Sequence, residues 1–135
     1  MIVVDTNIIC YFYLTSEFSE LAEQLYIKES TWSAPILWRS EFRNVLAFYI
    51  RKKLITLSDA IEIFESAEDL LINNEFETST IQVLKLARDS GCSAYDCEFV
   101  NLAQDLSVKL ITMDQKIINN FPDTALSIPE YLEKI

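Results

Sequence analysis

A short apolar strand that ends on an aspartate occurs twice in this chain. Residues 2–4 form a β-branched run that stops at Asp5, and the largely apolar residues 108–113 run into Asp114. Such runs predict strands that are buried inside a sheet. In an open α/β sheet, ligands bind beyond the carboxyl ends of the strands. Two strands that each deliver an aspartate to this edge predict an acidic site that binds a cation.

The apolar periodicity elsewhere in the chain is mostly helical. Helices are expected at residues 8–14 (a short buried turn), 16–28, 36–53, 59–72, 80–89, 94–106 and 116–119, and from Pro129 onward. Two further strands are expected at residues 32–34 and 126–128. This alternation over 135 residues predicts one α/β domain, residues 1–135, with a mostly parallel sheet.

The pattern of residues 59–72 also predicts which side chains face the core. Thr56 or Ser58 stands where a helix N-cap is expected. The spacing then predicts that Ile61, Phe64 and Leu71 point inward.

The amino-acid composition removes several kinds of chemistry. The single glycine, Gly91, excludes glycine-rich phosphate loops and dinucleotide-binding motifs. Without histidine, the chain has no Ser-His or Cys-His pair, no zinc–histidine site and no histidine general base. The spacing of Cys10, Cys92 and Cys97 matches no metal site and predicts reduced, buried thiols. Chemistry must then come from carboxylates, hydroxyls, thiols or lysines.

The chain is strongly acidic. Its 21 acidic and 11 basic residues give a formal charge of −10. Such a surface repels nucleic acid unless metal ions and a local basic patch offset its field. The simpler interpretation is that most of these charges keep the protein in solution. The apolar start stops at Asp5, too early for a signal peptide or a membrane span, so we expect a cytoplasmic protein.

Glu41 interrupts an apolar stripe of the helix expected at residues 36–53. The residues at −4, +4 and +7 from it share its face and are Leu37, Val45 and Phe48. A buried carboxylate needs a cation or hydrogen-bond donors, because its desolvation is unfavourable. Two alternatives remain open for Glu41: a place in a cation site, or a salt bridge with Arg39 or Arg43 at the edge of the stripe.

Asp96 falls in the first turn of the helix expected at residues 94–106. With Ser93 it resembles a capping box, and Asp5 and Asp114 stand at N-cap positions of the turns that follow them. Capping is therefore the simpler interpretation of each aspartate alone. Together with Glu41, however, these aspartates form a set of hard oxygen ligands that suits Mg²⁺ or Mn²⁺.

The order of the motifs Asp5-Thr6-Asn7, Glu41, Tyr95 to Ala103 and Leu110 to Asp114 resembles that of the PIN-domain nucleases. Within that family, the pattern is most similar to the VapC-like toxins of toxin–antitoxin pairs, and the likeness spans the whole chain. The resemblance implies a three-layer sandwich with a central sheet of four or five mostly parallel strands and helices on both faces. It also implies an Mg²⁺- or Mn²⁺-dependent endoribonuclease, a homodimer and a small antitoxin as partner.

The resemblance also assigns roles by position. It implies that the catalytic and metal-binding acids are Asp5, Glu41, Asp96 and Asp114. Residues expected to steady these acids by hydrogen bonding are Asn7 and Thr112, with Glu98 as a further candidate for a supporting position.

Basic residues near the acids are needed to hold RNA. The candidates are Arg39, Arg43 and Lys116, with a solvated surface charge as the alternative for each. Residues 51–53 are all basic and are more simply explained as partners of a helix dipole. The aromatic residues Tyr11, Phe12, Tyr13, Phe48 and Tyr49 are most simply core residues, with a dimer face or an antitoxin groove as the alternative.

Two other functions compete with a nuclease. The acidic surface suits a non-catalytic interaction module built on the same fold. A phosphotransfer enzyme of the haloacid-dehalogenase type would use Asp5 as its nucleophile, but it needs a second aspartate two residues later, where this chain has Asn7.

Overall fold

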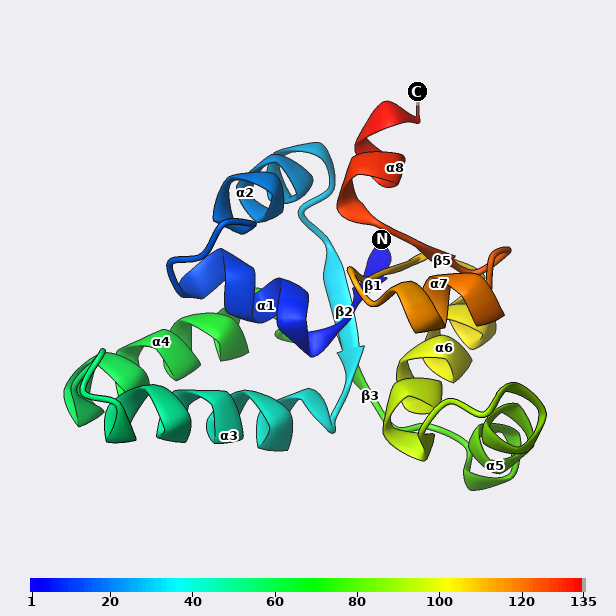
Figure 1. The fold of residues 1–135 in the computed structure, drawn as a ribbon, viewed down its shortest axis with the longest axis horizontal. Coiled ribbons are helices and arrows are strands. Elements are labelled where there is room, and N and C mark those ends of the chain that lie inside the picture. The colour runs from blue at the N-terminus through cyan, green and yellow to red at the C-terminus, as the bar shows by residue number, and fades with distance from the viewer. Residues whose placement is uncertain (135) are drawn as a thin grey trace.

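The computed structural model describes residues 1–134, and these contain a five-stranded parallel sheet in the order β3-β2-β1-β4-β5 (Figure 1). The strands are β1 (Ile2–Val4), β2 (Trp32–Pro35), β3 (Glu75–Phe76), β4 (Leu110–Ile111) and β5 (Ala125–Leu126). Each neighbouring pair is parallel. The prediction of an α/β fold with a central parallel sheet is confirmed.

Helices cover both faces of this sheet. They are α1 (Thr6–Tyr13), α2 (Ser19–Lys28), α3 (Trp38–Arg51), α4 (Leu57–Leu70), α5 (Thr80–Ser90), α6 (Ala94–Leu106), α7 (Gln115–Asn120) and α8 (Ile128–Glu133). In Figure 1, α1 to α4 lie on one side of the strands and α5 to α7 on the other. No helix within residues 1–134 is both long and apolar enough to cross a membrane.

The central strands are buried because helices pack on both of their faces. The residues of β1 and β2 are all fully buried. Trp32 and Trp38 are the largest side chains of the core, and Phe64 stacks on Trp38 with ring centroids 5.4 Å apart. The order of the sheet places β1 between β2 and β4. The carboxyl ends of these strands therefore meet at one edge.

Two expectations about local structure were wrong. Strand β3 was not expected, because Glu75–Phe76 is only two residues long and half-buried, so it shows no apolar run. Ile61 does not point inward but has 50% of its surface exposed. Phe64 and Leu71 do point inward, as expected, and the remaining inward positions of α4 are the small residues Ala60 and Ala67.

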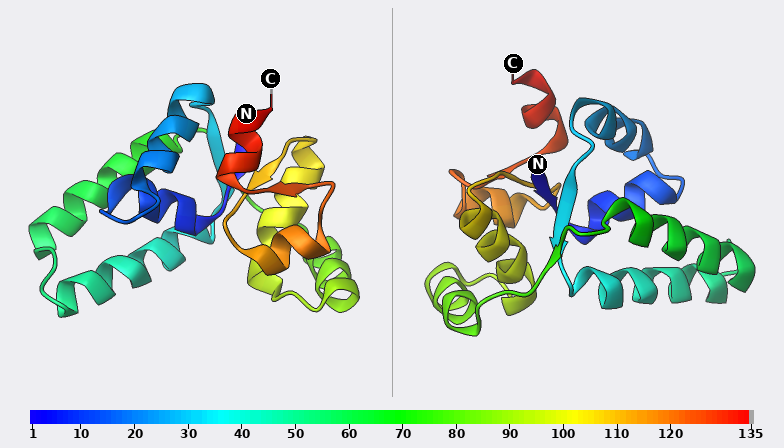
Figure 2. Two further views of the ribbon diagram at one scale, coloured as in Figure 1. Left: turned by 45° about the horizontal axis from the view of Figure 1, so that its top comes forward. Right: turned by 180° about the vertical axis from the view of Figure 1, so that it is seen from behind.

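Helices α3 and α4 form a hairpin that extends away from the sheet (Figures 1 and 2). Its base is held by Arg39, whose Nε and Nη2 donate to the two carboxylate oxygens of Glu75 at 2.7 and 2.8 Å. The same guanidinium donates from Nη1 to Glu68 at 2.7 Å. Three elements, α3, α4 and β3, are therefore joined by one side chain. At the tip, Lys53 adopts a left-handed conformation with φ of 60° and reverses the chain.

Candidate active site

Thr112 joins two of the predicted site acids at the carboxyl edge of the sheet. The pairing of β1 with β4 brings Asp5 beside this threonine, and the backbone N–H of Asp5 donates to Ile111 at 3.0 Å. The hydroxyl of Thr112 donates to Oδ2 of Asp5 at 2.8 Å. The backbone N–H of Asp114 donates to the same hydroxyl at 3.0 Å. One fully buried side chain thus fixes where both aspartates stand.

Thr6 holds Glu41 in the same way. Its hydroxyl donates to Oε1 of Glu41 at 2.7 Å, and the side chain is buried, with 4% of the residue exposed. No salt bridge among residues 1–134 involves Glu41. The alternative of an ion pair with Arg39 or Arg43 is therefore not what the structure shows. Sequence reasoning missed Thr6, although a polar residue that opens an otherwise apolar helix directly after Asp5 was a usable signal.

Asp96 lies in the first turn of α6, where the hydroxyl of Ser93 accepts its backbone N–H at 3.0 Å. In α4 and α8 the acid at the equivalent position closes a capping box with the N-cap residue. In α6, only the bond from the backbone of Asp96 to Ser93 is present in the described structure. The carboxylate of Asp96 is therefore not held in a capping box.

The acids of this edge influence one another electrostatically. Burial raises the pKa of Asp5 above its usual range, and the charge of Asp96 raises this pKa further, against the hydrogen bond from Thr112. Burial also raises the pKa of Glu41, assisted by the charges of Asp5, Asp96 and Glu98. The pKa of Asp96 is raised by burial and by the charge of Asp114. The structure thus brings the four predicted acids within electrostatic range of one another.

Cys10 lies beside these acids and is not a nucleophile. Burial, with the charges of Asp5 and Glu41, raises the pKa of its thiol to about 12. A thiol with such a pKa stays protonated at neutral pH and acts as an apolar wall. All three cysteines are buried and unpaired, as the sequence predicted.

The residues expected to support the acids have different environments. The side chain of Asn7 is exposed, and its backbone N–H lowers the pKa of Asp5 less than the hydroxyl of Thr112 and the backbone N–H of Thr6 do. Glu98 is half-buried and accepts a hydrogen bond from Thr78 at 3.2 Å. Lys116 donates from Nζ to the carbonyl of Gly91 at 3.1 Å, and its charge lowers the pKa of Asp96. Lys116 thus lies close enough to Asp96 to influence it electrostatically.

Two arginines of α3, Arg39 and Arg43, differ in their surroundings. Arg39, which the sequence suggested as an RNA contact, uses its guanidinium to bind Glu68 and Glu75 and to lie 5.6 Å from the ring of Trp38. Its place in the hairpin is structural. Arg43 is exposed and lies over the ring of Phe64, at 5.0 Å from the ring centroid.

The donor set of this edge fits a hard cation. Its side chains are carboxylates and hydroxyls, which are the ligands that Mg²⁺ and Mn²⁺ prefer. Within residues 1–134, no group of three or more acids or thiols stands close enough together to hold a metal ion. A site for Mg²⁺ at this edge would therefore rely on fewer protein ligands, since this ion usually keeps several water molecules and binds proteins through one or two carboxylates.

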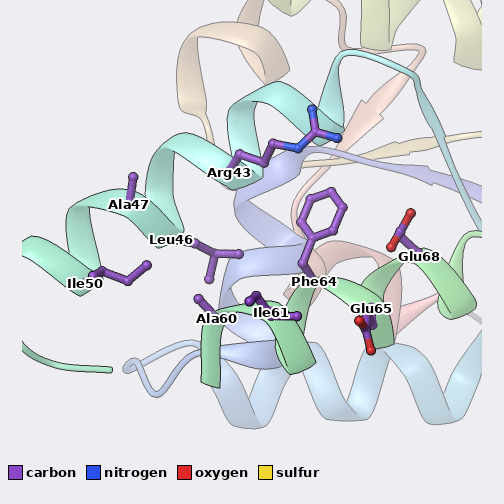
Figure 3. Close-up of a pocket in the computed structure, with 9 residues that line it drawn as sticks. All are labelled: Arg43, Leu46, Ala47, Ile50, Ala60, Ile61, Phe64, Glu65 and Glu68. Carbon is purple, nitrogen blue, oxygen red and sulfur yellow. The ribbon is translucent and has the colours of Figure 1, made fainter. Parts of the chain in front are cut away.

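A separate groove of about 340 Å³ lies between α3 and α4 (Figure 3). Its floor is apolar and includes Leu46, Ile50 and Phe64, while Arg43 and Glu65 stand at its edge. None of the four acids lines it. The groove is therefore a second surface feature, distinct from the acidic edge of the sheet.

The sequence is similar to known proteins over most of its length. The sequence profile of the PIN domain matches residues 2–122. Ribonuclease VapC3 of Pyrobaculum aerophilum is 29% identical over 125 residues, which cover 90% of this chain and 95% of that protein.

Solved structures share the fold. The crystal structure of PAE2754 from Pyrobaculum aerophilum superposes with a TM-score of 0.76 at 16% identity, over 97% of this chain and 85% of that chain. A toxin–antitoxin complex from Klebsiella pneumoniae gives a TM-score of 0.71 at 14% identity, over 95% of this chain and 98% of that chain. Because the family profile covers nearly the whole sequence and the sheet and helices match those of solved structures, this chain belongs to the PIN domain family.

Proposed function

We propose that this protein is a metal-dependent endoribonuclease that hydrolyses RNA phosphodiester bonds. The observation that carries the proposal is the meeting of Asp5, Glu41 and Asp96, from three distant parts of the chain, where threonine hydroxyls hold two of these acids and burial raises the pKa of all three. Unpaired carboxylates do not gather in a core for stability, because burial and mutual repulsion both oppose it. The similarity to a protein named a ribonuclease supports RNA as the substrate.

The residues that would hold Mg²⁺ or Mn²⁺ are Asp5, Glu41, Asp96 and Asp114. A bound ion of this kind lowers the pKa of a coordinated water and offsets negative charge on a phosphodiester. Thr112 and Thr6 orient the acids, because each hydroxyl fixes one carboxylate oxygen. Preset ligands reduce the reorganisation that binding and catalysis would otherwise require. Asn7 contributes its backbone N–H to Asp5, and Glu98 adds negative charge beside Glu41.

The RNA contacts are assigned to Lys116, which lies next to the acids, and to Arg43, which lines the groove between α3 and α4. Lys116 already faces Asp96, and Arg43 lies on the helix that carries Glu41. Arg39 is left out, because its guanidinium is bound by two carboxylates.

The protein is further proposed to be the toxin of a toxin–antitoxin pair and to act as a homodimer in the cytoplasm. The groove between α3 and α4 is a suitable place for an apolar antitoxin helix: its floor is apolar, and Ile61 lines it with half of its surface exposed. Glu65 and Glu68 at its edge favour a basic partner. The similarity to a solved toxin–antitoxin complex supports such a partner.

The test is cleavage of RNA with Mn²⁺ by the parent protein and by Asp5→Asn and Asp96→Asn. Both variants are expected to fold and to lose cleavage, whereas Glu23→Gln, an exposed acid of α2, is the matched control and keeps it. Undiminished cleavage by both site variants would reject the assignment. If the parent protein binds no Mn²⁺ in calorimetry, a non-catalytic interaction module, favoured by the net charge of −10, becomes the better proposal.

A further inference from the structure

The face of α3 that carries Glu41 continues outward from the acidic edge. Residues at +7 and +11 from Glu41 are Phe48 and Lys52, and both fall within about 20° of the direction of Glu41 around the helix axis. With a rise of 1.5 Å per residue, Lys52 lies about 16 Å beyond Glu41 along the axis. We call Phe48 and Lys52 the α3 strip.

The α3 strip is available to a ligand. Phe48 has 48% of its surface exposed, and Lys52 is exposed. The ammonium of Lys52 lies 5.6 Å from the centroid of the Phe48 ring, so an exposed aromatic face and a cation stand together. The groove towards α4 is formed by other residues of α3, among them Leu46 and Ile50, which Figure 3 shows pointing to that helix. The strip is therefore a different face from the groove.

The charge around the strip differs in sign from that of the whole protein. Arg51, Lys52 and Lys53 are three of only 11 basic residues in a chain of net charge −10. All are exposed at the tip of the hairpin. One cation near the last turn is enough to interact favourably with the helix dipole, so this role does not explain why three stand at one tip. A local positive field next to an exposed aromatic ring favours a polyanion with flat, stacking groups.

We propose that the α3 strip is a subsite for single-stranded RNA, in which a base stacks on Phe48 and Lys52 binds a phosphate. This inference rests on the proposed nuclease function and names where the substrate continues beyond the acids. Aromatic rings flanked by cations are the common platform for single strands. The distance of about 16 Å from Glu41 corresponds to roughly five stacked nucleotides at 3.4 Å each.

A protein occupant fits this face less well. A second copy would place two clusters of like charge, residues 51–53 of each chain, against one another. A predominantly apolar partner would leave the ammonium of Lys52 without water or a counter-ion. Phosphate groups satisfy these cations, and bases cover the ring, so RNA matches both features.

The subsite is tested by binding, separately from cleavage. An Asp96→Asn protein, which does not cut, is titrated into a fluorescent 12-nucleotide RNA, and its Kd is compared with those of F48A, K52A and the pair F48A/K52A in the same background. The pair is expected to weaken binding about 10-fold. K52A is expected to lower the slope of log K against log salt by about 0.7. The matched control is L84A/K85A, which removes an exposed apolar residue and a lysine from α5.

A second comparison uses the cutting protein. F48A/K52A is expected to cleave a 12-nucleotide RNA more slowly, through a higher KM, and to cleave a dinucleotide as fast as the parent does. Phe48→Leu keeps an apolar side chain without an aromatic face, so it is expected to lose RNA affinity as F48A does.

The outcomes are distinguishable. If the parent cuts neither substrate, the nuclease function fails, and the binding measurement still decides the subsite. If F48A/K52A binds the 12-nucleotide RNA as tightly as L84A/K85A does, the subsite is rejected. If F48L retains full affinity, no base stacks on Phe48 and the proposal is overturned. If F48A changes the oligomeric state in light scattering, the strip is a protein interface instead, which also overturns the proposal.

Discussion

The hydroxyl of Thr6 donates to Oε1 of Glu41 across 2.7 Å and so connects the start of α1 to the first turn of α3. These two residues are 35 positions apart in the sequence. The bond gives a half-buried carboxylate a donor that is not a cation. Glu41 therefore keeps a defined orientation without the salt bridge that would block it from a metal ion.

Removal of this bond is expected to weaken metal binding. Thr6→Val keeps the shape of the side chain but leaves Glu41 without its donor, and a hydrogen bond to a charged group contributes about 1.5–3 kcal/mol. The Mn²⁺ affinity in calorimetry should fall about 10-fold or more. Thr6→Ser restores the donor and should recover most of the affinity. Equal affinities of the valine and serine variants would show that the bond has no role in positioning Glu41.

Neutralising Asp5 is expected to stabilise the metal-free protein. The pKa of Asp5 is raised in the folded state, so the folded protein holds its proton more tightly than the unfolded chain does. Stability is therefore lost as the pH rises from the unfolded pKa of about 3.9 through the raised folded pKa. Asp5→Asn has no carboxyl group at this position, so its stability does not fall with pH for this reason. Urea unfolding with EDTA should show the variant more stable at pH 7 and the difference closing near pH 4.

The opposite result would also be informative. A less stable Asp5→Asn protein at pH 7 would mean that the carboxylate is favourably paired in the folded state, which contradicts the proposed repulsion among the acids.

Metal ions are expected to stabilise the parent protein at pH 7. An ion that binds only the folded state at ten times its Kd adds about 1.4 kcal/mol. The gain should disappear with EDTA, in Asp5→Asn, and near pH 4, where protons compete for the carboxylates. Thermal unfolding with and without Mn²⁺ measures it. A shift of equal size in the Asp5→Asn protein would place the ion elsewhere.

Substitutions of Arg39 and Arg43 are expected to affect different properties, the stability of the fold for Arg39 and RNA binding for Arg43. Arg39→Gln removes a bidentate pair with Glu75 and the bond to Glu68, so it should lower the free energy of unfolding by about 1–2 kcal/mol. Arg43→Gln removes an exposed cation and should leave stability nearly unchanged while weakening RNA binding. Denaturation curves and RNA titrations of both variants test this. The reverse pattern would restore Arg39 as the RNA contact.

The protein is expected to remain folded when a charged side chain is introduced into the groove between α3 and α4. Ile61→Asp alters a side chain that is half exposed, so stability should change by less than about 0.5 kcal/mol. Co-purification with the protein encoded beside this chain should be lost if an antitoxin helix uses the groove. Ile72→Asp, which changes an exposed isoleucine just beyond α4, is the control that should retain the partner.

The local elements were determined largely by the sequence. The runs ending at Asp5 and Asp114 predicted β1 and β4, and Gly91 ends α5 in a left-handed conformation with φ of 74°, as a single glycine after a helical pattern suggests. Patterns of this kind are readable because buried strands and amphipathic helices each impose their own period on the apolar residues. Strand β3 imposed none, since its two residues lie half-buried at the edge of the sheet.

The site was decided by tertiary structure. The sequence showed that Glu41 was out of place, and the family resemblance named Asn7 and Thr112 as supports. Thr112 does bind Asp5, but the hydrogen bond to Glu41 comes from Thr6, which was not expected. The sequence also suggested Arg39 as an RNA contact, whereas in the structure Arg39 forms an ion pair with Glu75 of β3. The physical reason is that hydrogen bonds and ion pairs reach only about 3–4 Å. Which donor comes that close to an acid depends on how distant segments pack against one another. The periodicity of apolar residues along the chain does not predict this packing.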